Sequence, residues 1–214
     1  MAAVTFKLVS RNIASSKIIE RIIDIVRSEK PDLLLLQEVT LTTAQLEAVL
    51  QPLQYNCESN IDPENPSVPG TAAIWRLNIP ATEVTSIVTC HMQAVTIGLQ
   101  TFYNVYAPSG SENRRDRAHL FTQEMFPNLL QHQGGLLPVL AGDCNGLTAA
   151  KDTTRNFKDK YCKELDNVVK SFNYRDAFPV LHPQQIEFKF YRASCAPSRL
   201  DRVYLPPLPI LLSK

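Results

Sequence analysis

Four short segments of the sequence each place a polar side chain at or near the end of a predicted strand. They read LLLLQE, NVYAPSG, AGDCN and SRLDRVYL. Their candidate functional side chains are Glu38, Tyr106, Asp143, Asn145 and Asp201. Because the ends of neighbouring strands meet at one edge of a sheet, side chains that are far apart in sequence can share a pocket there.

These side chains suit the cleavage of a phosphodiester. A hard divalent cation such as Mg²⁺ prefers oxygen ligands and keeps much of its water, so Glu38 and a substrate phosphate could hold it together. Asp143 could position or deprotonate an attacking water, and Asn145 could hold that water or a phosphate oxygen. The phenol of Tyr106 could donate to a non-bridging oxygen as charge builds there.

Each segment taken alone has an ordinary structural interpretation. A glutamate after a strand is often a solvated strand end, Y-A-P is a common exit from a strand, and G-D-x-N is a common turn. The functional hypothesis therefore depends on finding all of them in this order.

The apolar pattern predicts helices and strands that could position these side chains. Apolar alternation from Val4 to Leu8 predicts a first strand, and Leu33 to Leu36 predict a strand that is buried on both faces. The other predicted strands are Thr71–Trp75, Val84–Cys90, Ala94–Leu99, Phe102–Tyr106, Leu136–Ala141, Phe188–Tyr191 and Leu200–Leu205. The predicted helices are Ile18–Arg27, Leu46–Leu50, Ala118–Leu130 and Arg155–Phe172. Two packed sheets with helices outside them are the natural architecture for this order of elements.

Length and composition favour a single domain over residues 1–214. The chain has 214 residues, of which 44% are hydrophobic, enough for one sizeable core. Its 22 Lys and Arg against 21 Asp and Glu give a net charge of +1, so any contact with nucleic acid must be local. The candidate positive contacts are Lys17, Arg114, Arg115, Arg117 and Arg192.

Five scattered cysteines without C-x-x-C spacing argue against a disulfide framework and against a structural zinc. The sequence has no secretory apolar region and no apolar run that approaches the roughly 18 residues of a membrane span. We therefore expect an intracellular protein without membrane contact, nuclear if it acts on DNA. The oligomeric state cannot be predicted.

The ordered set Q-E, Y-A-P-S, G-D-x-N and S-R-L-D resembles the motifs of the endonuclease/exonuclease/phosphatase family, from Phe6 to Leu205. The LQEV context, the charged residues after YAPSG and the LHP segment are most similar to the endonuclease domain of non-LTR retrotransposons. Abasic-site repair enzymes are the next most similar. The resemblance implies an α/β fold, a four-layer α/β/β/α sandwich of two packed mixed β-sheets flanked by helices. It also implies a DNA-nicking phosphodiesterase that uses Mg²⁺ or Mn²⁺ and leaves a 3′-hydroxyl.

The resemblance also assigns roles to individual residues. It would make Glu38 the metal ligand and Tyr106 the phosphate contact. Asp143 and Asn145 would position the nucleophile, and Asp201 would orient a histidine. Asn12, in SRNIASS, matches an asparagine that lies near the metal in the family.

The sequence departs from the family pattern at its C-terminal end. The family has a last strand followed by S-D-H, and this chain has no such tripeptide, so we expect the final strand to be missing and turnover to be slight. The histidines are His91, His119, His132 and His182, and none of them follows S-R-L-D. His182, in LHP, could substitute for the family histidine, although in the resembling proteins this position is structural.

Two smaller departures fall within the motifs. Lys189 stands where threonine is usual, and it could strengthen backbone contact, block the metal or point to solvent. Cys144 replaces a large aromatic residue, which predicts looser packing without chemical effect.

Two alternatives to the nicking enzyme remain open from the sequence. One is a non-catalytic remnant or nucleic-acid-binding module of the same fold, which the missing S-D-H favours. The other is a phosphatase of small phosphoesters or phospholipid headgroups, because relatives with the same core motifs do this.

Overall fold

The computed structural model describes residues 6–14, 17–132, 134–149, 153, 161–183, 190–192, 195–198 and 200–207, with backbone only at 82, 190–192 and 195–198. The chain forms two compact units. The first contains Met1–Gly98 and Tyr103–Tyr106, and the second contains Leu99–Phe102 and Ala107–Lys214. Strand β7 (Gln100–Tyr106) therefore contributes residues to both. The prediction of a single domain over 1–214 stays a prediction.

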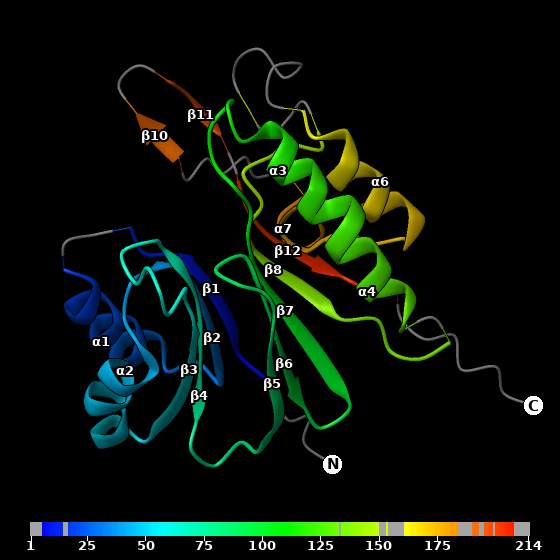
Figure 1. Ribbon diagram of the computed structural model, residues 1–214. Coiled ribbons are helices and arrows are strands. Elements are labelled where there is room, and N and C mark those ends of the chain that lie inside the picture. Colours follow the sequence, from blue (N-terminus) through cyan, green and yellow to red (C-terminus); the bar gives the residue numbers. More distant parts are fainter. Residues whose placement is uncertain are drawn as a thin grey trace, which may run out of the picture. The chain divides into compact units, whose positions relative to one another are not determined.

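The first unit contains a four-stranded mixed sheet with helices on one face (Figure 1). Its order is β1-β2-β4-β3, with β1 parallel to β2 and the other pairs antiparallel. The strands are β1 (Leu8–Asn12), β2 (Leu33–Val39), β3 (Tyr55–Asn60) and β4 (Gly70–Arg76). The helices are α1 (Ile18–Glu29), α2 (Thr43–Leu50) and the 3₁₀ turn η1 (Gln51–Leu53).

The leucine run of β2 explains the burial of this sheet on both faces. All four leucines from Leu33 to Leu36 are fully buried. Leu34 and Leu36 pack into one apolar cluster with Ile22 and Val26 of α1 and with Leu46 of α2. The two-sided burial predicted for this strand is confirmed.

The ends of the two helices follow from local sequence. Helix α1 ends where Lys30 adopts a left-handed conformation immediately before Pro31, which cannot continue a helix. Helix α2 begins with a capping box, in which Thr42 and Gln45 satisfy each other's backbone N–H groups.

Strands of a second sheet contact the first sheet within this unit. They are β5 (Ala81–Val88), β6 (Met92–Ile97) and the Tyr103–Tyr106 end of β7. Asn104 is fully buried at this contact and donates to the carbonyls of Leu36, at 3.1 Å, and Ala72, at 3.0 Å. It also accepts a hydrogen bond of 2.7 Å from Gln37 Nε2. One amide from the second sheet therefore satisfies three buried polar groups of the first sheet.

Replacing Asn104 with leucine should destabilise the protein substantially. The change leaves two carbonyls and the Gln37 amide without their partner in a buried place, so we expect a loss of roughly 2–4 kcal/mol of unfolding free energy. Urea unfolding followed by circular dichroism would measure it. Asn128→Leu is the control, because Asn128 bonds only to Glu124 O on a partly exposed helix face. An equal loss in both variants would contradict the role of the buried amide.

In the sheet of the second unit the strands lie in the order β7-β8-β12-β9, and β12 is antiparallel to both of its neighbours. Its strands are β8 (Val139–Asp143), β9 (Arg175–Asp176), β12 (Asp201–Leu205) and the antiparallel pair β10 (Phe190–Arg192) and β11 (Cys195–Ser198). Its helices are α3 (Arg114–His119), the π-helical turn η2 (Leu120–Met125), α4 (Phe126–Leu130), α6 (Lys163–Ser171) and α7 (Ala177–Leu181). Figure 1 shows α3 and α4 following each other along one continuous helical segment, with α6 beside it and β8 and β12 next to it.

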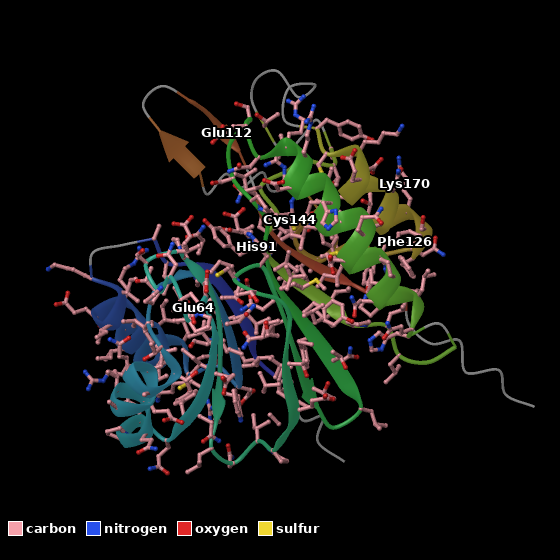
Figure 2. All side chains as sticks on the ribbon, viewed as in Figure 1. Glu64, His91, Glu112, Phe126, Cys144 and Lys170 are labelled. Atoms are coloured by element: carbon pink, nitrogen blue, oxygen red, sulfur yellow. The ribbon has the colours of Figure 1, made fainter. Side chains whose placement is uncertain are left out.

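Aromatic and ionic contacts hold the layers of the second unit together. The rings of Phe126 and Phe172 meet edge to face with centroids 5.1 Å apart (Figure 2). The buried Arg202 of β12 donates to Asp176 Oδ2 at 2.6 Å and so joins β12 to β9. The chain thus has two mixed β-sheets flanked by helices, and the predicted α/β fold is confirmed.

Several predicted boundaries were wrong. Strand β1 begins at Leu8, so Phe6 lies outside it with 41% of its surface exposed, and Val4 lies outside the described residues. The helix predicted from Ala118 begins at Arg114. The strand predicted to end at Ala141 continues to Asp143, because Asp143 pairs with Asp201 across the sheet.

For the predicted helix Arg155–Phe172, the described part shows α6 from Lys163 to Ser171, preceded by Tyr161, which forms a β-bridge with Leu147. Residues 154–160 and 188–189 lie outside the described residues. Among the elements of the described residues, β3, β9, β11, α7 and the 3₁₀ turn η1 were not predicted. Among the described residues no helix has the length and apolar character needed to cross a membrane.

Candidate active site

Asn12 and Glu38 lie together at the ends of two neighbouring parallel strands. Asn12 ends β1 and pairs with Gln37 of β2. Its Nδ2 donates to Glu38 Oε1 at 2.7 Å, and its Oδ1 accepts from the backbone N–H of Ala14 at 3.1 Å. The amide is therefore fixed on both sides, and it holds the carboxylate in one orientation. Glu38 Oε2 has no hydrogen-bond partner within the described part of the chain.

Glu38 has an unusual backbone conformation. Its φ is +61°, in the left-handed region, and the pairing of β2 with β4 is irregular between Gln37 and Val39. A non-glycine residue with this φ is disfavoured, and such an irregularity changes the direction of a side chain. Gln37 and Val39 are both buried, whereas Glu38 is partly exposed. The irregularity thus places a carboxylate at the surface between two core residues.

Asp143 and Asn145 form a second fixed group, in the second unit. Asp143 is 6% exposed and accepts the backbone N–H of Asn145 on its Oδ1 at 2.9 Å. Asn145 has a left-handed backbone with φ of +44°, and its Nδ2 donates to the carbonyl of Ala107 at 2.7 Å. The N–H of Ala107 donates in turn to the backbone carbonyl of Asp143. Asn145 Oδ1 has no hydrogen-bond partner among the described residues, so it can accept a hydrogen bond from water.

Asp201 stands directly opposite Asp143. The two residues are cross-strand partners in the antiparallel pairing of β12 with β8. Directly paired side chains share one face of the sheet, with Cβ atoms about 4.5–5.5 Å apart. Two carboxylates at this spacing repel each other, so a bound cation or proton would stabilise the pair.

Tyr106 lies beside a histidine that the sequence analysis did not select. The backbone N–H of Tyr106 donates to the carbonyl of His91 at 2.8 Å. The His91 Nδ1 lies 2.8 Å from the carbonyl of Tyr106, and the two ring centroids are 6.2 Å apart (Figure 2). A carbonyl oxygen only accepts, so Nδ1 carries the proton. The Nε2 of His91 has no other partner in the described residues and is available to a ligand.

The structure thus brings the candidates together in three groups. Asn12 contacts Glu38, and Asp143 lies with Asn145 and Asp201. Tyr106 lies with His91. The first and third groups belong to the first unit, and the second group belongs to the second unit.

The chain matches the endonuclease/exonuclease/phosphatase family over residues 12–213. This match covers nearly the whole sequence, including all three groups. The chain belongs to this family. No curated protein matches the sequence significantly.

Solved structures show the same fold at low sequence identity. An AP endonuclease from Archaeoglobus fulgidus superposes with a TM-score of 0.79 at 17% identity, covering 95% of this chain and 87% of that one. A 3′ phosphatase, NExo, from Neisseria bound to a product DNA hairpin gives 0.80 at 17% identity with the same coverage. An AP endonuclease from Leishmania major gives 0.73 at 14% identity, covering 94% and 79%. These neighbours show the fold, family membership shows the endonuclease/exonuclease/phosphatase family, and closeness to the retrotransposon enzymes stays a prediction.

A metal site in this member of the endonuclease/exonuclease/phosphatase family would have few protein ligands. Within the described residues, no group of three or more His, Cys, Asp or Glu side chains could hold a metal ion. The carboxylate of Glu38 suits Mg²⁺, which usually takes one or two carboxylates together with water and substrate phosphate. The residues present therefore fit such an ion.

The cysteines have no part in this chemistry. Cys57, Cys90, Cys144 and Cys162 are free and buried. Burial raises the pKa of each thiol, to about 12 for Cys57. These thiols are poor nucleophiles and poor ligands at neutral pH.

The remaining predicted residues lie apart from these groups or outside the described part. His182 follows α7, where its N–H donates to Phe178 O and its ring lies 5.0 Å from the ring of Phe178. Arg117 donates to the carbonyls of Pro108 and Gly110. Lys17 pairs with Glu20 on the surface. Lys189 and the side chain of Arg192 lie outside the described residues.

Proposed function

We propose that the chain is a divalent-metal-dependent phosphodiesterase that nicks DNA and leaves a 3′-hydroxyl, as the endonucleases of non-LTR retrotransposons do. The observation that supports this most directly is the buried Asp143 fixed beside Asn145, with Asp201 opposite. A carboxylate and an amide acceptor held side by side can position a water molecule. An aspartate with only a structural role at a strand end would rarely be buried, hydrogen-bonded to a fixed asparagine and opposite a second carboxylate.

In this proposal Asn145 and Asp143 act on the attacking water. Asn145 Oδ1 accepts a hydrogen bond from one O–H of the water, and the carboxylate of Asp143 takes the proton of the other O–H as the oxygen attacks phosphorus. The P–O3′ bond breaks, and the 3′-oxygen leaves as a hydroxyl after it takes up a proton from the solvent. The hydrogen bond from Asn145 N–H keeps Asp143 in place, so little reorganisation is needed during the reaction. Asp201 lies opposite Asp143 across the sheet.

Glu38 is the proposed ligand of Mg²⁺ or Mn²⁺. Such an ion, when bound, neutralises charge on the phosphate. The hydrogen bond from Asn12 to Oε1 leaves Oε2 as the coordinating oxygen and prevents rotation of the carboxylate. Asn12 is therefore a positioning residue.

Tyr106 and His91 are the proposed contacts to the non-bridging oxygens of the phosphate. The Tyr106 phenol donates a hydrogen bond, as the family resemblance implies. His91 Nε2 donates a second one when the imidazole is protonated, and Nδ1 stays bound to the Tyr106 carbonyl. This imidazole could take over part of the charge stabilisation that the S-D-H histidine supplies elsewhere in the family.

Replacing His91 with alanine should slow nicking by roughly ten- to a hundredfold, the effect of losing a hydrogen bond worth about 1.5–3 kcal/mol to a charged group. Initial rates of plasmid nicking would measure it. His119→Ala is the control, since His119 is an exposed imidazole on α3 near Glu124. A rate for His91→Ala equal to that of His119→Ala would remove His91 from the site.

The proposed substrate is DNA, and the proposed place of action is the nucleus. The Neisseria 3′ phosphatase of the same fold is described as bound to a product DNA hairpin. With a net charge of only +1, this chain would bind DNA through local cations and phosphate contacts, with modest sequence preference.

Supercoiled plasmid incubated with the purified protein tests the proposal. We expect relaxation with Mg²⁺ or Mn²⁺ and none with EDTA, and we expect the nicks to prime a DNA polymerase because they carry a 3′-hydroxyl. Absence of nicking with both ions would reject the proposal.

The missing S-D-H favours one other candidate, a DNA-binding module of the same fold without activity. Gel-shift binding of duplex DNA without nicking, unchanged by Glu38→Gln, would indicate it. Release of phosphate from small phosphoesters or headgroups without DNA cleavage would instead indicate a phosphatase.

A further inference from the structure

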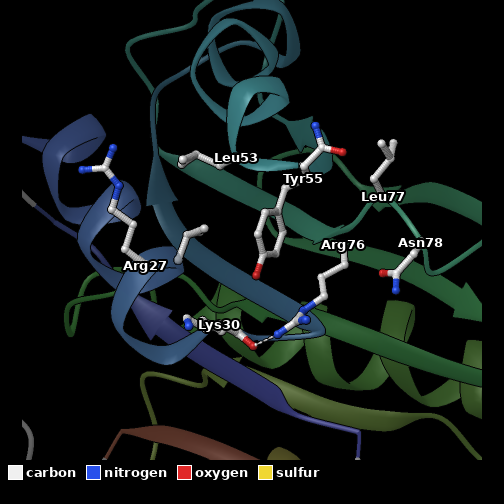
Figure 3. Close-up of a pocket in the computed structure, with 9 residues that line it drawn as sticks. Arg27, Lys30, Leu53, Tyr55, Arg76, Leu77 and Asn78 are labelled. Carbon is white, nitrogen blue, oxygen red and sulfur yellow. Dashed lines mark hydrogen bonds between the residues drawn. The ribbon is translucent and has the colours of Figure 1, made fainter.

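A cavity of about 660 Å³ lies at the end of the first sheet where β2 begins and β4 ends (Figure 3). Three turns build its walls, after α1, after η1 and after β4. Its lining includes the cations Arg27, Lys30 and Arg76 and the apolar surfaces of Leu53, Tyr55 and Leu77. The volume is within the usual range for ligand sites, about 300–1,000 Å³.

Hydrogen bonds between the turns hold this cavity open. The Tyr55 hydroxyl donates to Pro31 O at 3.0 Å, and Arg76 Nε donates to the same carbonyl at 3.2 Å. Figure 3 shows Arg76 also reaching the carbonyl of Lys30. The backbone N–H of Leu77 donates to Gln54 O at 2.9 Å. A ligand would therefore enter a preformed site and would not have to order it.

The cations that line the cavity differ in their partners. Arg76 pairs with Asp32 at 3.2 Å. Glu29 of α1 pairs with Arg11 at 3.0 Å. The side chains of Arg27 and Lys30, in contrast, have no hydrogen bond or ion pair with any described residue. The cavity thus offers two positive charges, on Arg27 and Lys30, beside an apolar floor. This floor is formed by Leu53 and Tyr55.

Leu77 adds to the apolar character of the opening, because 55% of its surface is exposed. An exposed leucine beside a cavity contributes free energy only when a ligand covers it. The apolar floor and the cations Arg27 and Lys30 together favour a ligand that has an apolar group flanked by negative charges.

We infer that this cavity binds a short acidic peptide segment of a partner protein, with a large apolar side chain in the cavity and flanking carboxylates on Arg27 and Lys30. The charge complementarity and the apolar floor carry this choice. A nucleic-acid backbone would need a row of cations and would leave the leucines uncovered. The cavity is also separate from the candidate active site, because Glu38 lies near the opposite end of β2. At about 3.3 Å per residue, the strand separates the two by roughly 20 Å.

A fluorescein-labelled peptide of sequence Asp-Glu-Leu-Phe-Glu-Asp is a suitable probe. Fluorescence anisotropy should give a Kd of roughly 10–100 µM for the full chain, as expected for a single small pocket. The Arg27→Glu/Lys30→Glu protein should bind at least about tenfold more weakly, since two attractive charges at the opening become repulsive ones. Plasmid nicking should stay unchanged in this variant.

Two controls make the result specific. Arg21→Glu changes the same charge on the same helix outside the cavity, and should leave binding within about twofold. The peptide with alanine in place of Leu and Phe should not bind the wild-type chain. Equal weakening by Arg21→Glu, no binding to the wild type, or displacement of the peptide by a single-stranded oligonucleotide of equal charge would each overturn the proposal.

Discussion

Replacing Asp143 with asparagine will lower the rate of plasmid nicking by on the order of a hundred- to ten-thousand-fold, the usual effect of losing a general base. Asparagine keeps an oxygen that can accept the N–H of Asn145, so the local fold survives. It removes the carboxylate charge that would take a proton from water, and it also removes the repulsion with Asp201 across the sheet. The unfolding free energy should therefore be unchanged or higher while the activity is lost.

Asp166→Asn is the matched control for this experiment. Asp166 is another largely buried carboxylate of the second unit, where it accepts from Tyr161 at 2.7 Å and from Lys170 at 2.6 Å. Its loss should reduce stability only slightly and leave nicking nearly unchanged, because the ammonium of Lys170 is exposed and an ion pair with an exposed partner contributes little. Equal nicking by wild-type and Asp143→Asn protein would show that the activity comes from a contaminant.

The part of the candidate site that lies at the ends of strands could be predicted from the sequence. The leucine run from Leu33 to Leu36 could only be a strand buried on both faces, which placed Glu38 at a sheet edge. The parallel pairing of β1 with β2 then brings Asn12 to the same edge. Side chains at strand ends can be predicted from the composition and order of the strands. The carboxyl ends of neighbouring parallel strands lie at the same edge of the sheet whatever their register.

The rest depends on contacts that no local pattern encodes. His91 lies in a turn, and only its pairing with the end of β7 places its imidazole beside Tyr106. The left-handed backbone of Glu38 results from an irregular pairing with β4, which is a property of two strands together. Strand β3 was missed because its exposed positions are polar and it follows a helix directly, so that only Tyr55 and Cys57 suggest alternation.

The opposition of Asp143 and Asp201 illustrates the same limit. The two motifs are separated by more than fifty residues of chain, and their pairing is fixed by the register of β8 against β12. A shift by one residue would place Arg202 opposite Asp143 and turn Asp201 to the other face of the sheet. The buried pair of Arg202 with Asp176 opposes that shift, because it would remove a partner from a buried guanidinium. A structural ion pair thus secures the register on which the candidate site depends.

Replacing Glu38 with glutamine should weaken metal binding without disturbing the sheet. The amide oxygen can still accept from Asn12 Nδ2, but a neutral oxygen is a poorer ligand for a hard cation than a carboxylate. We expect the Mg²⁺ concentration for half-maximal nicking to rise roughly ten- to a hundredfold, and calorimetric binding of Mn²⁺ to weaken in parallel. This separates Glu38 from Asp143, whose substitution should lower the rate at saturating metal.

Glu58→Gln is the matched control for Glu38→Gln. Glu58 lies on β3 of the same sheet, is exposed, and accepts from Thr43 Oγ1 at 3.2 Å. Its substitution removes the same charge from the same sheet, so a general electrostatic effect on cation binding would appear in both variants. A shift in the Mg²⁺ requirement with Glu38→Gln alone would identify a ligand. An unchanged Mn²⁺ affinity in Glu38→Gln would show that the hydrogen bond from Asn12 serves only to stabilise the irregular end of β2, and the cation would then have to bind at the Asp143–Asp201 pair.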